Sequence, residues 1–359
     1  MVDAVEAAGV TMQRLQWVRG VVVLGLAGAV VGVVPDGVSA LPARRRCRET
    51  AFVANVVSGT VSTIDVRTRT KDPADIAVGT SPFGVAVTPD GKTAFVTNSS
   101  SGTVSTIDVK TKTKDPADIV VGSLAFWVAV TPNGKTAFVT NNESGTVSTI
   151  DVKTRIKDPS DIAVGGNPKG VAITPNGKTA LVAQANLGLG LVSGPAGNSV
   201  STIDAKTRTT RPSDIVVGSN PIGVAVTPDG KTAFVTNSAS NTVSTIDVKT
   251  GTKDPNDIAV GAFPIGVAIT PDGKTAFVVN RDSGSVSTID VKTRTEDPNN
   301  IAVGALPAEV AITPNGKTAL VTNQSGTVST IDVKTRTKDP SDIPVGPEPI
   351  GVAITRCRR

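Results

Sequence analysis

The sequence predicts an all-β fold, a seven-bladed β-propeller with four antiparallel strands in each blade. One segment of about 40 residues recurs seven times and contains short apolar runs separated by Gly and Pro, a pattern typical of propeller blades. Val and Thr are abundant and aromatic residues are few, so strand-forming residues dominate the composition. The repeats extend nearly to the last residue, and residues 41–359 are therefore expected to form one domain.

Each copy is expected to contain four strands, as the second copy illustrates. The first two, Val85–Thr88 and Ala94–Thr97, flank an Asp-Gly turn, where Gly tolerates the positive φ of a tight hairpin. The third is Thr103–Val109. The fourth, Asp118–Val121, follows an Asp-Pro pair, and Pro is tolerated only near an outer edge. The seven copies begin at Ala51, Ala94, Ala137, Ala180, Ala233, Ala276 and Ala319.

One position of the second strand carries a large apolar side chain in every copy. The first strand alternates Val with small Ala, which suits the innermost strand, where blades converge on the axis. We therefore expect the large side chains to fill the space between neighbouring blades. They are Phe52, Phe95, Phe138, Leu181, Phe234, Phe277 and Leu320.

Two polar residues recur in almost every copy, an Asp after Thr-Ile and an Asn at the end of the second strand. A side chain needed once per blade is more typical of a turn cap than of a site, because Asp and Asn readily bind nearby backbone. Turn caps are expected at Asp65, Asp108, Asp151, Asp204, Asp247, Asp290 and Asp332, and at Asn55, Asn98, Asn141, Gln184, Asn237, Asn280 and Asn323.

The first copy lacks its first strand, which reappears at the C-terminal end as Gly351–Thr355. Pairing of this C-terminal strand with the N-terminal blade would close the ring and remove exposed sheet edges. The only two cysteines, Cys47 and Cys357, lie at this junction, at equivalent turn positions counted from its two sides. We therefore expect a Cys47–Cys357 disulfide in an exported protein.

Residues 1–40 are expected to be a signal peptide. Two Arg precede an apolar run, Val21–Val34, and small residues follow up to Ala40, where cleavage is expected. Fourteen apolar residues are too few to span a bilayer. The sequence thus predicts a secreted or cell-envelope protein that is not integral to the membrane after cleavage, and leaves open whether Met1 or Met12 is the start.

The chain contains no His, which is both the commonest general base and the commonest metal ligand. Ser-His-Asp and Cys-His hydrolysis are therefore excluded, and neither a metal site nor a cofactor is expected. Gly-Lys-Thr occurs six times, but no Gly precedes it at phosphate-loop spacing and no helix follows. These segments are interpreted as hairpin turns.

Three recurring segments carry a family resemblance: AFVTN at 94–98, TVSTIDV at 103–109 and PFGVAVTPDGK at 82–92. Over about residues 47–359 the chain resembles the YVTN-type β-propeller repeat family, which implies an extracytoplasmic or cell-surface propeller. It also resembles the lactonase-like seven-bladed propellers, a hydrolase group. No lactonase catalytic pattern maps onto this chain residue by residue.

Function is expected where the copies differ. Four aromatic residues outside the blade-packing position lie between an outer strand and the next inner strand, and Trp127 replaces the Gly of most copies. The fourth copy carries about ten extra residues, 187–196, at the same end of the blades. We expect this top face to bind a ligand or partner. Its candidate residues are Phe83, Phe126, Trp127, Lys169, Leu187, Leu189, Phe263, Arg281 and Glu309.

The opposite face is expected to carry a basic patch without stacking aromatics. The net charge of the whole chain is modest: residues 1–40 contain two Arg and three acidic residues, so their removal changes it only from +5 to +6. The patch could contact anionic wall polymer, lipid or nucleic acid. It consists of Arg44, Arg45, Arg46, Arg48, Arg356, Arg358 and Arg359.

The leading hypothesis from the sequence is an exported, monomeric, non-catalytic scaffold that binds an unknown protein or envelope ligand through its top face. The alternative is a lactonase-like hydrolase that uses a lone carboxylate such as Glu309. A polyanion-binding protein is a weaker alternative. Whether the protein is an enzyme stays open, and the absence of His favours a protein without catalysis.

Overall fold

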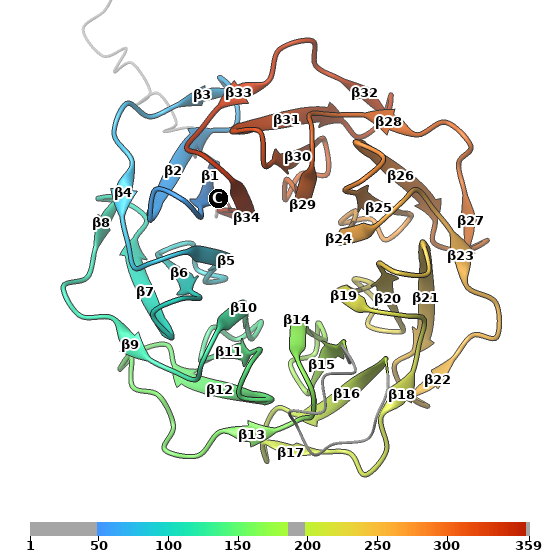
Figure 1. Ribbon diagram of the computed structural model, residues 1–359, viewed down its shortest axis with the longest axis horizontal. Coiled ribbons are helices and arrows are strands. Elements are labelled where there is room, and N and C mark those ends of the chain that lie inside the picture. Colours follow the sequence, from blue (N-terminus) through green and yellow to red (C-terminus); the bar gives the residue numbers. More distant parts are fainter. Residues whose placement is uncertain (1–48, 186–197, 357–359) are drawn as a thin grey trace, which may run out of the picture. The chain divides into compact units, whose positions relative to one another are not determined.

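The computed structural model describes residues 49–185 and 198–356, which belong to a compact unit spanning Cys47–Arg359. Their strands form seven antiparallel sheets around a central axis (Figure 1). The prediction of a seven-bladed all-β propeller is confirmed. No helix able to cross a membrane occurs among these residues.

The blades are numbered in chain order, and blade 1 combines β34 with β1 to β4. The innermost strands of blades 1 to 7 are β34 (Pro349–Ile354), β5 (Pro82–Val87), β10 (Ala125–Val130), β14 (Pro168–Ile173), β19 (Pro221–Val226), β24 (Pro264–Ile269) and β29 (Pro307–Ile312). The second strands are β1 (Thr50–Asn55), β6 (Thr93–Asn98), β11 (Thr136–Asn141), β15 (Thr179–Gln184), β20 (Thr232–Asn237), β25 (Thr275–Asn280) and β30 (Thr318–Asn323). The third strands are β2 (Thr60–Asp65), β7 (Thr103–Asp108), β12 (Thr146–Asp151), β16 (Ser199–Asp204), β21 (Thr242–Asp247), β26 (Ser285–Asp290) and β31 (Thr327–Asp332).

The outer edge of each blade is formed by short two-residue strands. The pieces that come first along the chain are β3 (Thr70–Lys71), β8 (Thr113–Lys114), β17 (Thr209–Thr210), β22 (Thr252–Lys253), β27 (Thr295–Glu296) and β32 (Thr337–Lys338), and blade 3 has only the bridge between Ile150 and Lys157 there. The pieces that come second are β4 (Ile76–Ala77), β9 (Ile119–Val120), β13 (Ile162–Ala163), β18 (Ile215–Val216), β23 (Ile258–Ala259), β28 (Ile301–Ala302) and β33 (Ile343–Pro344).

The prediction of a single fourth strand at Asp118–Val121 is therefore wrong, because the outer edge consists of two separate short strands. In blade 2, β8 pairs with one end of β7 and β9 pairs with the other. Pro116 lies between the two pieces and has no N–H to donate, so the ladder is interrupted there. A side-chain bond holds the interrupted edge, because the Ser105 hydroxyl donates to Asp118 Oδ1 at 2.7 Å.

The inner strands begin three residues earlier than expected, at Pro82 rather than Val85 in blade 2. Pro82 pairs with Asn98 and Val85 pairs with Val96, so β5 contains one more residue than β6 between these pairs. This is a β-bulge, which bends the strand and re-aims its side chains. The same register shift occurs in all seven blades. Phe83, Phe126 and Trp127 thus lie within inner strands, not in connecting loops.

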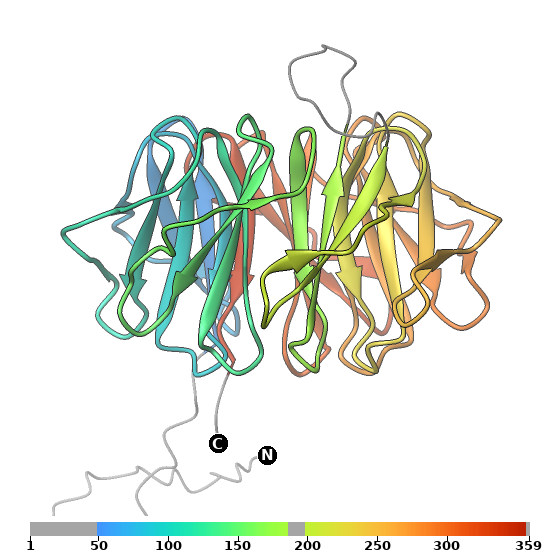
Figure 2. The ribbon, with the colours of Figure 1, turned by 90° about the horizontal axis from the view of Figure 1, so that it is seen from below.

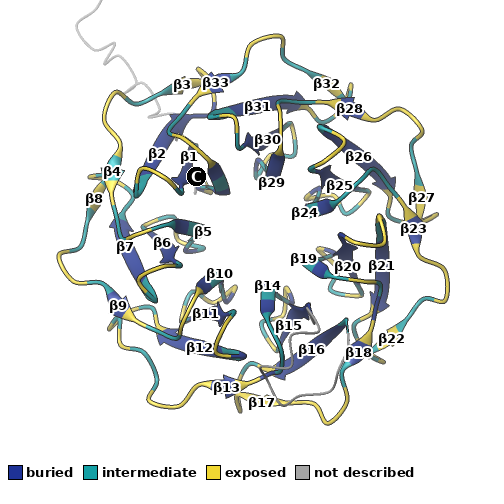
Figure 3. Ribbon diagram, in the orientation of Figure 1, coloured by how far each residue is buried: buried dark blue, intermediate teal, exposed yellow. Residues whose placement is uncertain are grey.

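The core lies between the blades, as the large apolar residues predict. Phe95 is fully buried and packs with Ala125, Ala137 and Val139 of the next blade. Phe52 packs in the same way against blade 2. The three long strands of each blade are mostly buried, whereas the outer pieces and turns carry most of the exposed residues (Figure 3). The side view separates the connecting turns into two faces of the propeller (Figure 2).

The ring closes as predicted, since β34 pairs antiparallel with β1. The Thr355 N–H donates to the Thr50 carbonyl at 2.9 Å, and the Thr50 N–H donates to Thr355 Oγ1 at 2.8 Å. Cys47 and Cys357, for which we predicted a disulfide, lie outside the described residues.

The recurring Asp caps a turn, as expected. Asp108 Oδ1 accepts hydrogen bonds from the Thr111 N–H at 2.7 Å and the Thr111 hydroxyl at 2.9 Å. The recurring Asn is not simply a turn cap. Asn98 is fully buried, its amide donates to Ser105 Oγ at 3.0 Å, and its Oδ1 accepts from the N–H of Gly79, which follows the outer edge of blade 1. It therefore connects two blades.

A threonine hydroxyl near the end of the second strand also connects neighbouring blades. Thr97 Oγ1 accepts from the Gly84 N–H in its own blade at 2.8 Å and donates to the Phe126 carbonyl of the next blade at 2.9 Å. Blades 1, 4 and 6 have Ala54, Ala183 and Val279 at this position. The bridging residues are Thr97, Thr140, Thr236 and Thr322.

An ion pair joins neighbouring blades at their outer edges at six of the seven boundaries between described residues. At the boundary of blades 4 and 5, Arg211 stands where the other six copies have Asp, and Gly251 stands where they have Arg or Lys. A Cβ at Gly251 would lie 3.4 Å from the Arg211 guanidinium. The six pairs are Arg69–Asp339, Lys112–Asp72, Arg155–Asp115, Arg208–Asp158, Arg294–Asp254 and Arg336–Asp297.

Candidate functional site

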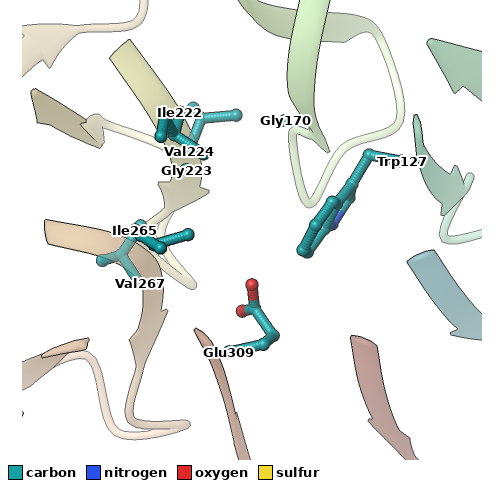
Figure 4. A pocket seen from close by; sticks show the side chains of 8 residues that line it. All are labelled: Trp127, Gly170, Ile222, Gly223, Val224, Ile265, Val267 and Glu309. Atoms are coloured by element: carbon teal, nitrogen blue, oxygen red, sulfur yellow. The ribbon is translucent and has the colours of Figure 1, made fainter. Parts of the chain in front are cut away.

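A pocket lies where the bulged ends of the inner strands of blades 3 to 7 meet (Figure 4). The space between its walls is about 270 Å³, including the part open to solvent. Apart from one carboxyl group, the lining side chains are apolar. The lining residues are Trp127, Gly170, Ile222, Gly223, Val224, Ile265, Val267 and Glu309.

The pocket owes its shape to one position of the bulge. This position is Gly in five blades, because a side chain there would meet the backbone of the next blade. A Cβ at Gly84 would lie 2.9 Å from the Phe126 carbonyl oxygen. Blades 3 and 7 instead carry Trp127 and Glu309 at this position. Both side chains project into the space that the neighbouring glycines leave open (Figure 4).

Glu309 is the only ionisable residue among the described residues that line the pocket. Its N–H donates to Thr322 Oγ1 at 3.1 Å, which fixes the backbone from which the side chain projects. The side chain keeps some solvent contact, but the surrounding protein removes most of its hydration. This desolvation raises the pKa of Glu309 to about 8. No described Lys or Arg forms an ion pair with it that would oppose the shift.

Trp127 belongs to an aromatic cluster with Phe83 and Phe126. The Phe83 and Phe126 ring centroids are 4.0 Å apart, and the Trp127 ring lies 5.7 Å from Phe83 in an edge-on arrangement. Lys169 Nζ lies 5.1 Å from the Phe126 ring centroid, and burial lowers the pKa of this amine. Four of the predicted site residues are thus brought together on three consecutive inner strands.

Two other predicted residues of the top face, Phe263 and Arg281, are not among the residues that line this pocket. Phe263 lies in the connection before β24, and the Arg281 guanidinium stacks over its ring at 5.6 Å. Arg281 also pairs with Asp282 at 3.5 Å. Leu187 and Leu189 lie outside the described residues.

Of the predicted basic patch, the structure describes only Arg356, which follows β34 and is exposed. The other six Arg lie outside the described residues. The described part of the chain holds no cluster of three or more His, Cys, Asp or Glu that could bind a metal ion. The carboxyl group that Glu309 presents to the pocket can support proton transfer.

Sequence reasoning missed that Trp127 and Glu309 occupy the same repeat position. The signal was present, because aligning the copies places both at the third residue of the inner strand, where the others have Gly. It also missed the apolar wall, since Ile222 and Ile265 look like ordinary repeat residues.

A family profile described as "Lactonase, 7-bladed beta-propeller" matches residues 51–347. No significant match occurs among curated proteins.

Several solved structures share the fold. Hydrazine synthase of Kuenenia stuttgartiensis is 24% identical, with a TM-score of 0.68 over 78% of this chain and 91% of that chain. A proposed 6-phosphogluconolactonase of Bacteroides fragilis is 20% identical, with a TM-score of 0.70 over 88% and 100% of the two chains. Another, from Bacteroides uniformis, is 16% identical, with a TM-score of 0.72 over 86% and 100%. At these identities the likeness establishes the fold alone.

The family match contradicts our leading expectation from the sequence, an exported non-catalytic scaffold, and favours the hydrolase alternative. That expectation was wrong because it gave too much weight to the absence of His. A carboxyl group whose pKa is raised by burial can transfer protons near neutral pH in place of an imidazole.

Proposed function

Because this chain belongs to the seven-bladed β-propeller lactonase family, we propose that it hydrolyses a lactone in the pocket between Trp127 and Glu309. The observation that carries the proposal is the carboxyl group of Glu309, which stands in an apolar pocket with a pKa raised to about 8. Perturbed carboxyl groups of this kind are typical of general acid–base catalysis.

In this proposal the ionised Glu309 carboxylate takes a proton from a water molecule. The resulting hydroxide attacks the lactone carbonyl carbon and forms a tetrahedral intermediate. The bond between that carbon and the ring oxygen then breaks, and protonated Glu309 returns its proton to the departing alkoxide. The products are one hydroxy acid per lactone and, after its ionisation, one proton released to solvent.

The apolar walls have two roles in this mechanism. They strip water from Glu309, which makes its carboxylate a stronger base once ionised. They also position the lactone ring against Trp127. The names of the two Bacteroides neighbours, proposed lactonases for a sugar phosphate, further support ring-ester hydrolysis as the reaction class.

The test is a proton-release assay in weak buffer with a panel of five- and six-membered lactones. Glu309→Gln should lower kcat/KM by about 100-fold or more, the usual contribution of a positioned acid–base group. Glu143→Gln, which changes an exposed carboxyl group in the turn after β11, is the matched control and should leave kcat/KM unchanged. For the wild type, kcat/KM should rise with pH and reach half its plateau near pH 8. Wild-type activity in Glu309→Gln would refute the assignment.

We also propose that residues 1–40 direct export and that Cys47 and Cys357 form a disulfide. The hydrogen bonds between Thr50 and Thr355 support the pairing, because they hold the chain together two or three residues from each cysteine. Peptide mapping without reduction should find the two cysteine peptides linked. Two free thiols would contradict this.

A further inference from the structure

The pocket that we assign to lactone hydrolysis also restricts which lactone can enter. We infer that the substrate is a small, uncharged, flat lactone with an apolar or aryl-fused ring, rather than a phosphorylated sugar lactone. This inference rests on the proposed function for the reaction itself. It rests on the pocket walls for the choice of substrate.

The charge of the pocket disfavours a phosphorylated substrate. A phosphate monoester carries nearly two negative charges at neutral pH and is normally held by several Arg or Lys. The described residues that line the pocket include no Arg or Lys, and the one that ionises, Glu309, is acidic. The nearest basic residue along the chain, Lys169, precedes the lining residue Gly170 and stacks over Phe126. A single partly desolvated amine cannot balance a dianion.

The hydrogen-bonding capacity of the pocket disfavours a sugar ring. Each buried hydroxyl of a ligand needs a partner, and an unpaired one costs about 1–3 kcal/mol. The hydroxyl of Thr236, on the strand beside Gly223, accepts from the Gly223 N–H at 2.8 Å and donates to the Ile265 carbonyl at 2.7 Å. The Thr322 hydroxyl likewise has both bonds occupied, because it accepts from the Glu309 N–H at 3.1 Å and donates to the Ile350 carbonyl at 2.7 Å. Apart from Glu309 and the Trp127 indole, no described side chain in the lining thus offers a hydrogen-bonding group to a ring with three or four hydroxyls.

The shape of the pocket favours a flat ring. Trp127 forms one wall, and Ile222 and Ile265 lie on the other side (Figure 4). Contacts with Phe83 and Phe126 hold the indole, so it forms a fixed surface for stacking. The pocket is small and part of it is open to solvent, so a thin ring stacked on the indole is favoured over a bulky one.

The experiment compares three lactones with the full-length protein: dihydrocoumarin, glucono-δ-lactone and 6-phosphoglucono-δ-lactone. We expect kcat/KM for dihydrocoumarin to exceed the other two by about 100-fold, the scale on which unpaired polar groups are rejected. Calorimetric titration with the non-hydrolysable lactam 3,4-dihydroquinolin-2-one measures binding without catalysis. The phosphorylated comparator in that titration is 6-phosphogluconate.

Trp127→Gly tests the flat wall with the residue that five other blades carry at this position. It should weaken lactam binding by about 10-fold, the scale of lost aromatic stacking and burial, and circular dichroism confirms that the variant is folded. The substrate comparison needs no variant, so it decides the inference even if Trp127→Gly fails to fold.

The outcomes separate the inference from the proposed function. Hydrolysis that favours the phosphorylated or polyhydroxylated lactone overturns the inference and leaves the reaction class standing. Lactam binding without hydrolysis of any lactone overturns the proposed reaction and supports the pocket specificity. Absence of both hydrolysis and lactam binding overturns both.

Discussion

Replacing Glu309 by Gln should change how the stability of the propeller depends on pH. Desolvation raises the pKa of Glu309 from 4.5 to about 8, so the folded protein keeps this group protonated at neutral pH. Below pH 4.5 the group is protonated in both the folded and the unfolded chain, and burial then carries no ionisation penalty. Between pH 4.5 and 8 only the unfolded chain loses the proton, so the free energy of unfolding falls as pH rises.

The size of this effect follows from the shift. Each pKa unit corresponds to about 1.4 kcal/mol, so the full shift would be worth about 5 kcal/mol. Glu309 keeps some solvent contact, and screening by water reduces the penalty, so we expect about 2–3 kcal/mol. Above pH 8 the group is ionised in both states and the penalty stays constant. Gln has a similar shape and does not ionise, so the variant escapes the penalty.

The assay is urea unfolding of wild type and Glu309→Gln at pH 4, 6, 8 and 9. The stability advantage of the variant should be small at pH 4, grow through pH 6 and level off above pH 8. Glu143→Gln, an exposed carboxyl group, should show no such trend. A constant difference between wild type and Glu309→Gln from pH 4 to pH 9 would refute the claim that burial keeps this carboxyl group protonated.

Two further predictions concern the contacts between blades. The double variant Arg211→Asp/Gly251→Arg should create the seventh ion pair of the outer edge, and its free energy of unfolding should exceed that of Gly251→Arg alone by about 0.5 kcal/mol, with the difference lost at 1 M salt. The single variant is the reference because Gly251 has a φ of 72°, so any side chain there is strained in both variants; equal stability of the two variants would show that no pair forms. Thr97→Ala should lower the free energy of unfolding by about 1–2 kcal/mol, because it leaves the buried Gly84 N–H without its acceptor. The matched control is Thr97→Ser, which removes the methyl group and keeps the hydroxyl, and an equal loss there would contradict the role of the hydrogen bond.

Much of the fold could be predicted because each copy of the repeat contains the residues that specify its own turns and strands. An Asp-Gly turn specifies the inner hairpin, and Phe95 recurs in register with the other blade-packing residues. Ring closure also followed from the sequence, because the strand missing from the first copy occurs at the C-terminal end. The outer edge was predicted less well. Its two short pieces depend on side-chain bonds such as Ser105 to Asp118, which no strand pattern displays.

The residues of the candidate site show a second feature that the sequence predicted only in part. The sequence marked three aromatic residues as exceptions to the repeat and placed them in loops. Because the inner strands begin earlier and contain a bulge, these residues instead lie on the strands nearest the axis; they are Phe83, Phe126 and Trp127. Glu309 was named as a lone carboxylate, yet its raised pKa could not be read from the chain. Desolvation depends on the apolar atoms around a group, and these come from distant copies.

The repeat alone therefore determined the strand order, the number of blades and the large side chains between them, because each depends on neighbours within one or two copies. The tertiary structure decided that Trp127 and Glu309, far apart in sequence, would face one small apolar space. Closure of seven blades around an axis brings the same repeat position of every blade to one place. Two departures from glycine at that position thereby become one site.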